Sequence, residues 1–117
     1  MEKIGFIVKS DDHERKSWEL VLKMGEVAQS TGYEIQIFAM MNGIYHLLQG
    51  RTKKDEPDPK VEAIEKIMDR GAKIMVFGIS AQERGFESAK QFIDGVKMGG
   101  MTELANMIGA CDQVICL

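Results

Sequence analysis

Four short apolar runs recur along the chain, separated by segments of helix length. They span residues 4–8, 35–40, 74–79 and 114–117. None of them alternates cleanly between apolar and polar positions, which is typical of strands that are buried on both faces. The resulting β-α-β alternation predicts an α/β fold, with a mainly parallel sheet of four to five strands and helices on both faces.

The segments between these runs carry the signals of helix ends. Asp11, followed three residues later by Glu14, forms a capping-box pattern that predicts a first helix starting near Asp11 and ending at Gly32. Apolar or small residues recur on one face of this helix: Trp18, Val21, Leu22, Gly25 and Ala28. Further helices are predicted from about Pro59 to Arg70, after Ser80, and over 102–108 with Thr102 as the cap.

Two stretches between elements stand out by composition. Residues 50–60, GRTKKDEPDPK, combine dense charge with two prolines and predict a mobile, exposed loop. Residues 94–101, DGVKMGGM, carry three glycines and predict either a short edge strand or a tight connection. Their glycine spacing does not match a phosphate-binding fingerprint, so a plain turn is favoured there.

Length and charge limit the classes of function. A chain of 117 residues forms one domain, 1–117, and its net charge of −3 comes without the basic stripe that nucleic acid requires. No apolar run approaches the ~20 residues that cross a bilayer, and the first apolar run is too short for a signal peptide. We therefore expect a cytoplasmic protein that binds neither nucleic acid nor membrane.

The two cysteines are expected to be reduced thiols. If the last run is extended, Cys111 and Cys116 lie too far apart for a disulfide. Cys116 is expected to be an inert apolar residue of a strand, whereas Cys111 is expected to meet solvent, with its pKa raised by Asp112. Neither spacing nor neighbours predict a metal site, and the sequence predicts no cofactor.

Candidate binding residues follow the strands, because the carboxyl ends of parallel strands form the usual site. We expect a pocket made by Ser10, Asn42, Gly78, Ser80 and Arg84. Ser80 lacks the surroundings of a nucleophile, so a helix cap is the favoured role. Two roles are open for Arg84. In the first it binds an anion or lowers the pKa of a neighbouring thiol, and in the second it ends a short helix together with Gly85.

Four stretches together resemble the DsrE/DsrF-like family. They are KIGFIVKSDDHERKSWELVLKMG, YEIQIFAMMNGIYHLL, GAKIMVFGISAQERGF and DGVKMGGMTELANMIGACDQVICL. The closest likeness is to the sulfur-carrier or peroxiredoxin-like members of that family. The resemblance implies a compact α/β domain that assembles into homo- or hetero-oligomers. It also implies a cysteine at the end of the third strand, which accepts a persulfide sulfur and passes it to a small partner.

The family's cysteine position corresponds to Phe77 in this sequence. A phenyl ring can neither form a thiolate nor hold a persulfide, so the usual mechanism does not carry over. The leading interpretation is therefore a binding or accessory subunit that takes a small ligand or a relay partner. Whether the protein is an enzyme stays open.

Two alternatives remain. The first is a sulfurtransferase that uses Cys116 or Cys111 as its carrier thiol, and the second is a purely structural subunit. A homo-oligomer is also expected, because the apolar residues after the second strand exceed what a solvated loop needs. Those residues are Met40, Met41, Ile44, Tyr45, Leu47 and Leu48.

Overall fold

The computed structural model describes residues 2–10, 16–48 and 59–117. Its centre is one parallel sheet with the order β4-β3-β2-β1-β5. The strands are β1 (Lys3–Val8), β2 (Glu34–Ala39), β3 (Lys73–Phe77), β4 (Lys97–Gly99) and β5 (Gln113–Cys116). The predicted fold class is confirmed, and residues 94–101 supply the edge strand β4.

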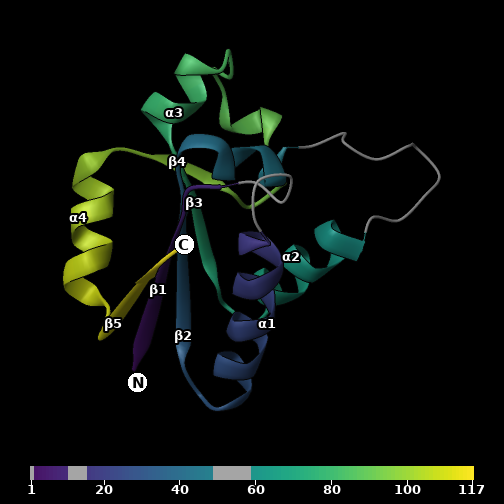
Figure 1. The fold of residues 1–117 in the computed structure, drawn as a ribbon, viewed down its shortest axis with the longest axis vertical. Coiled ribbons are helices and arrows are strands. Elements are labelled where there is room, and N and C mark those ends of the chain that lie inside the picture. Colours follow the sequence, from purple (N-terminus) through teal and green to yellow (C-terminus); the bar gives the residue numbers. More distant parts are fainter. Residues whose placement is uncertain (1, 11–15, 49–58) are drawn as a thin grey trace.

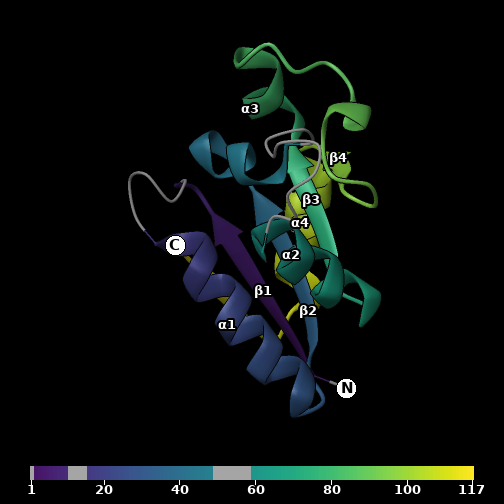
Figure 2. The ribbon, with the colours of Figure 1, turned by 90° about the vertical axis from the view of Figure 1, so that its right-hand side faces the viewer.

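Helices cover both faces of the sheet. Helices α1 (Ser17–Ser30) and α2 (Pro59–Asp69) lie on one face, and α4 (Met101–Ala110) lies alone on the other (Figure 1). Turned by 90°, α1 and α2 lie side by side in front of the strands (Figure 2). In the part of the chain that the structure describes, no helix is long and apolar enough to cross a membrane.

Shorter helical segments gather beyond the carboxyl ends of the strands. They are the 3-10 segment η1 (Met41–Leu47), helix α3 (Gly78–Glu83) and the 3-10 segment η2 (Ala89–Gln91). Because η1 follows β2 and α3 follows β3 directly, both segments start at the edge of the sheet where parallel α/β proteins place their sites. This edge is at the top of Figure 1.

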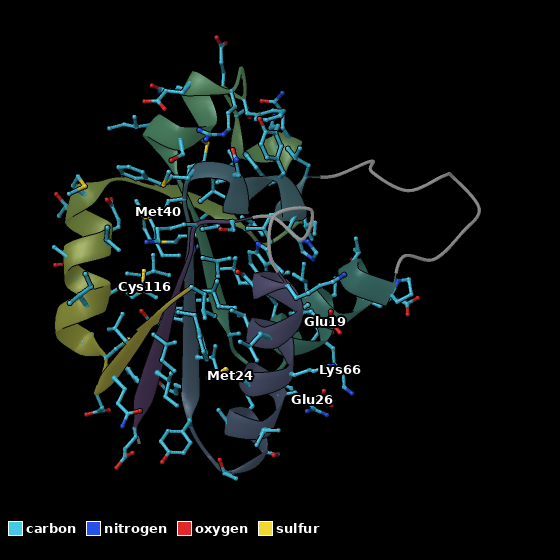
Figure 3. All side chains as sticks on the ribbon, in the orientation of Figure 1. Glu19, Met24, Glu26, Met40, Lys66 and Cys116 are labelled. Carbon is cyan, nitrogen blue, oxygen red and sulfur yellow. The ribbon has the colours of Figure 1, made fainter. Side chains whose placement is uncertain are left out.

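The main core lies between the sheet and the helices α1 and α2. Trp18 is fully buried there, and its indole Nε1 donates to the carbonyl oxygen of Gly43 at 2.8 Å. The ring of His46 stacks on Trp18 at a centroid distance of 5.1 Å. A salt bridge of 3.3 Å between Lys66 and Glu26 joins α2 to α1 at the surface (Figure 3).

A smaller core lies beneath α4. It consists of Phe38, Phe77, Leu104 and Met107, with the rings of Phe38 and Phe77 5.8 Å apart. Phe77 is only 9% exposed. Strand periodicity explains this placement, because alternate residues of β2 and β3 point to the same face.

Several predicted boundaries differ from the structure. Strand β3 ends at Phe77 and α3 begins at Gly78, so Ser80 lies inside the helix and the predicted cap is wrong. Helix α4 begins at Met101, and Gly100 rather than Thr102 is its N-cap. The described part of α1 begins at Ser17; the predicted start near Asp11 and most of the predicted mobile loop at 50–60 lie outside the described residues.

The apolar stretch after β2 is mostly core. Ile44 and Leu47 are fully buried, and Leu48 packs against the same core. These residues therefore do not form an exposed apolar surface, and the argument for an oligomer interface at this stretch was wrong. Only Met41, at 52%, is strongly exposed within it.

Candidate functional site

The topology of the sheet identifies one point on its carboxyl edge. From β1 the chain passes through α1, on one face, to β2; from β4 it passes through α4, on the other face, to β5. The strand order therefore reverses between β1 and β5, and open α/β sheets bind ligands in the crevice at such a switch point. A cavity of about 620 Å³ lies there.

This crevice, the name used below for the cavity between the ends of β1 and β5, takes its walls from four elements. They are the residues after β1, the first turn of α1, the start of η1 and the end of β5. The lining residues are Lys9, Ser10, Lys16, Ser17, Leu20, Met41, Asn42, Cys116 and Leu117. Two predicted pocket residues, Ser10 and Asn42, thus meet in one place, and Cys116, which carries one of the predicted carrier thiols, also lines it.

Backbone hydrogen bonds fix the walls of the crevice. The amide of Lys9 donates to the carbonyl oxygen of Leu117 at 2.9 Å, and the amide of Leu117 donates to Ile7 at 2.7 Å. Segment η1 lies so close to β1 that a Cβ on Gly43 would collide with the carbonyl oxygen of Val8. Glycine is therefore required there for steric reasons.

Met41 has an unusual backbone conformation at the rim of the crevice. Its φ of +53° lies in the left-handed region, which a side chain such as methionine rarely adopts. Its amide donates to the hydroxyl oxygen of Ser80 at 2.9 Å, which helps to hold this conformation. Strain of this kind is often found at functional sites.

Arg84 anchors a second polar group, which we call the Arg84 cluster: Asn42, Ser80 and Arg84. The Nε and Nη2 atoms of Arg84 donate to Oδ1 of Asn42 at 3.2 and 2.9 Å, and Nη1 donates to the carbonyl oxygen of Ser80 at 3.1 Å. Its guanidinium also lies 5.9 Å from the ring centroid of Tyr45. These contacts join α3 to η1.

The five predicted pocket residues therefore divide into two groups. Ser10 and Asn42 line the crevice, whereas Ser80 and Arg84 form the cluster, with Asn42 belonging to both. Gly78 lies next to the edge strand, where a Cβ would be 3.6 Å from the carbonyl oxygen of Gly99. Ser80 is only 5% exposed, and its hydroxyl accepts the Met41 amide.

The solvent exposure of the two cysteines is the reverse of what the sequence predicts. Cys116 is exposed, with its side chain on the α4 side of the sheet (Figure 3), whereas Cys111 is partly buried. Burial is the main cause that raises the pKa of the Cys111 thiol; Lys3 lowers that pKa and Asp112 raises it further. Both thiols are free, as predicted.

Lys9, Lys16 and Ser17 are absent from the sequence-based predictions because only the spatial strand order assembles them. The sequence indicates that β5 exists but not that it pairs with β1, which brings Cys116 level with Ile7. Among the described residues, no group of three or more His, Cys, Asp or Glu side chains is placed to hold a metal ion.

Comparisons with known proteins agree with this architecture. The sequence profile of the DsrE/DsrF-like family matches residues 2–117. An uncharacterized protein of Methanopyrus kandleri is 29% identical over 94 residues, which cover 80% of this chain and 76% of that protein. A second, of Methanocaldococcus jannaschii, is 26% identical over 94 residues, 80% of this chain and 81% of that protein.

Solved structures share the fold. The crystal structure of the ychN protein of E. coli superposes with a TM-score of 0.83 at 22% identity, covering 100% of both chains. A protein of unknown function from Methanobacterium thermoautotrophicum gives a TM-score of 0.79 at 12% identity, also covering 100% of both chains. At these identities the similarity establishes the fold alone.

Proposed function

Because this chain belongs to the DsrE/DsrF-like family, and is thereby related to sulfur-relay proteins, we propose that it is a binding subunit of sulfur-relay chemistry. Its ligand, or a segment of a relay partner, occupies the crevice between β1 and β5. The observation that carries the proposal is the cavity of about 620 Å³ at the switch point of the sheet. Cavities of this size hold small molecules or a few side chains.

The place of Phe77 supports a binding role over the family's usual transfer step. Its ring is buried in the core beneath α4, against Phe38, and not in the crevice. The position therefore contributes packing here, with no sulfur chemistry. The crevice in turn combines an apolar rim, Leu20 and Met41, with polar groups at its walls, as small-molecule sites do.

A thermal-shift screen tests this proposal. The panel consists of small thiols, persulfides, sulfur oxyanions and nucleotides, and a ligand that binds the folded chain raises its melting temperature. Ser10→Phe fills the crevice and should abolish the shift, whereas Ser30→Phe, at the far end of α1, should retain it. A shift that survives Ser10→Phe would place the ligand elsewhere, and no shift from any compound would contradict small-molecule binding.

A second candidate is a carrier role for Cys116, favoured by its exposure beside the crevice. The Cys116 thiolate, after losing its proton to solvent, attacks the outer sulfur of a donor persulfide, R–S–S⁻. A new S–S bond forms on Cys116, the donor's S–S bond breaks, and the donor leaves as R–S⁻ with the bonding electron pair. Cys111 is the weaker candidate, because it is partly buried and its pKa is raised.

Intact-protein mass spectrometry separates the two candidates. After incubation with a persulfide donor, a carrier gains the mass of one sulfur atom, which a reductant removes. The gain should disappear in Cys116→Ser and persist in Cys111→Ser. No gain in the native chain excludes the carrier role and leaves the binding role.

We also propose a cytoplasmic homo-oligomer that meets a relay partner. Exposed apolar side chains on α4 and β5, Ile108 at 47% and Val114 at 37%, support association through that side of the molecule. Size-exclusion chromatography with light scattering tests it. A monomer at micromolar concentration would contradict the proposed oligomer, and the proposed binding role of the crevice would be unaffected.

A further inference from the structure

Strand β5 forms one edge of the sheet (Figure 1), and within the described residues it pairs with β1 alone. At its end, the amide of Leu117 donates to the carbonyl oxygen of Ile7 at 2.7 Å, and the carbonyl oxygen of Leu117 accepts the amide of Lys9 at 2.9 Å. Both polar backbone groups of Leu117 therefore face β1. Because the backbone of a strand repeats every two residues, Gln113 and Ile115 face β1 in the same way.

The residues between them, Val114 and Cys116, turn their backbone groups away from the sheet. They present two amides and two carbonyl oxygens along the open side of β5, and both residues are exposed. A row of unpaired groups of this kind is a template for another extended chain. The chemistry of this edge therefore suits a further β-strand.

The two edges of the sheet differ in how well they resist such pairing. Strand β4 is three residues long, begins with the exposed Lys97 and ends at Gly99, and short strands with lysine are protected edges. Strand β5, QVIC, contains neither lysine nor proline. Exposed apolar side chains, those of Ile108 and Val114, lie on the α4 side of the molecule. The β5 edge is thus the one that is open to association.

A second copy of β5 satisfies all the outward groups at once. In an antiparallel pair with a two-fold axis at Ile115, Val114 lies opposite Cys116 of the second copy, and each such pair exchanges two hydrogen bonds. The two pairs use all four outward groups of each copy. Moving the axis to Val114 would set Cys116 opposite Asp112, whose amide already donates to Lys3 at 2.8 Å. The register centred on Ile115 is therefore favoured.

Side-chain charges do not oppose this pairing. Residues 113–117 carry no charged side chain. The carboxylate of Asp112, the next charge along the chain, is turned back to β1, where it accepts the amide of Lys3 at 2.8 Å. In the register centred on Ile115, the carboxylate of Leu117 lies opposite the uncharged Gln113 of the second copy.

Helix α4 leaves room for the second copy. Its end lies over β1, where a Cβ on Gly5 would come within 3.3 Å of Cε of Met107. Three strand spacings, about 14 Å, separate the β1 strands of the two copies. A helix with its side chains is about 10–12 Å wide, so α4 of each copy fits on the same face of the joined sheet.

We infer that two copies of this chain associate by antiparallel pairing of their β5 strands, which joins the two sheets into one. This inference rests on the proposed homo-oligomer and names the surface through which two copies bind. It also concerns the crevice, because Cys116 and Leu117 line it and the strand of the second copy runs beside them.

Disulfide crosslinking tests the register. In Val114→Cys/Cys111→Ser the introduced thiol lies opposite Cys116 of the second copy, at a Cα distance of about 5.5 Å, which a disulfide spans. Oxidised glutathione takes up the two electrons and two protons of each thiol pair, and a covalent dimer is expected on a non-reducing gel. The control Lys97→Cys/Cys111→Ser has the same number of thiols, with the new one on the other edge, and should give no covalent dimer.

Cys111→Ser alone is the control for the register, because it sets Cys116 opposite Val114 of the second copy. It should form little covalent dimer. Crosslinking of Cys111→Ser as fast as that of Val114→Cys/Cys111→Ser, or no crosslinking of the latter, would overturn the inferred register.

Sedimentation equilibrium measures the dissociation constant of the dimer. Val114→Pro removes an amide that β1 does not use, and should weaken the dimer at least about tenfold. Val114→Thr keeps the amide and the branched side chain, and its dissociation constant should stay within about threefold of the native value. A thermal melt shows whether Val114→Pro is folded, and the crosslinking test stands if it is not.

The outcomes separate the pairing from the oligomer itself. An oligomer that forms equally well in folded Val114→Pro, with no crosslink from Val114→Cys, would overturn the β5 pairing alone, and another surface would hold the copies together. A native chain that is monomeric would overturn both the pairing and the proposed homo-oligomer, and would leave this edge to a strand of another protein.

Discussion

The Arg84 cluster and the crevice share one edge of the sheet and one residue, Asn42, yet they use their polar groups differently. In the cluster every guanidinium nitrogen of Arg84 donates to a protein oxygen, either of Asn42 or of Ser80. In the crevice the amides of Ser17, Trp18 and Glu19, in the first turn of α1, have no acceptor among the described residues. We therefore expect the cluster to stabilise the fold and the crevice to be the part of this edge that binds the proposed ligand.

This difference shows how residues that stabilise the fold can be told apart from residues that bind a ligand on the same surface. Residue type alone does not do so, because arginine, serine and asparagine suit either role. The hydrogen-bond partners decide. Mutations in the cluster should lower stability, and mutations in the crevice should lower binding at nearly constant stability.

Gly43→Ala should have the largest effect, because both regions depend on segment η1. The added methyl group collides with the carbonyl oxygen of Val8, so η1 has to move away from β1. We expect a loss of about 3 kcal/mol in the free energy of unfolding, measured by urea denaturation. Gly109→Ala, whose methyl group meets nothing on the exposed face of α4, should instead stabilise by about 0.5–1 kcal/mol.

Arg84→Met should cost about 2 kcal/mol, because carbonyl oxygens of Asn42 and Ser80 lose charged donors in a largely buried site. Urea denaturation measures the loss. Arg70→Met, at an exposed position directly after α2, is the control and should change stability by less than about 0.5 kcal/mol. If Arg84→Met and Arg70→Met changed the free energy of unfolding equally, the Arg84 cluster would not stabilise the fold.

The two thiols give a smaller contrast, in reaction rate. A maleimide should label Cys116, in the variant Cys111→Ser, about tenfold faster than it labels Cys111 in Cys116→Ser, because Cys111 is partly buried and its pKa is raised. In urea the two rates should converge. Faster labelling of Cys111 in the folded protein would contradict the orientation of β5.

The smallest expected effect on stability is at the N-terminus of α4. At α4 the Glu103 carboxylate accepts the amide of Gly100 at 2.7 Å, which lowers the pKa of Glu103 from 4.5. The carboxylate form therefore stabilises the fold above pH 4.5, and this contribution is lost as the pH falls through the lowered pKa. Glu103→Gln should be slightly less stable than the native chain at neutral pH, and equally stable in acid.

A pH series of thermal melts measures the Glu103 effect. Glu65→Gln, at an exposed position of α2, is the control for the loss of a surface carboxylate. A constant difference between native chain and Glu103→Gln at every pH would mean that the carboxylate charge is not responsible. At α1 the N-cap residue Lys16 makes no side-chain cap hydrogen bond, so the described residues offer no equivalent variant there.

The fold was largely predictable from the sequence, because it follows from local patterns. Apolar runs mark the parallel strands, and Gly32 and Gly71, with φ of +95° and +101°, end helices as such residues do. The expectation that every run is buried on both faces was wrong for β5, which is mostly exposed at the edge of the sheet. The edge strand in 94–101 was one of two alternatives, since its three residues carry little periodicity. The start of α3 at Gly78 was missed because Ser80 was expected to be its cap, whereas the Ser80 hydroxyl accepts the amide of Met41.

The site was only partly predictable. Ser10 and Asn42 were identified because they directly follow strands, and this rule is local. Lys16, Ser17 and the exposure of Cys116 depend on β5 pairing with β1, a contact between residues about a hundred positions apart. Nothing in the residues of β5 alone specifies its neighbour.

The most direct test compares the stability of Lys9→Gln/Lys16→Gln/Ser17→Ala with that of Arg84→Met by urea denaturation. The charge-matched control is Lys73→Gln/Lys97→Gln, at positions away from the crevice. The account predicts that the triple variant stays within about 0.5 kcal/mol of its control, while Arg84→Met loses about 2 kcal/mol. A triple variant that loses as much as Arg84→Met would show that the crevice groups hold the fold and are not kept for a ligand.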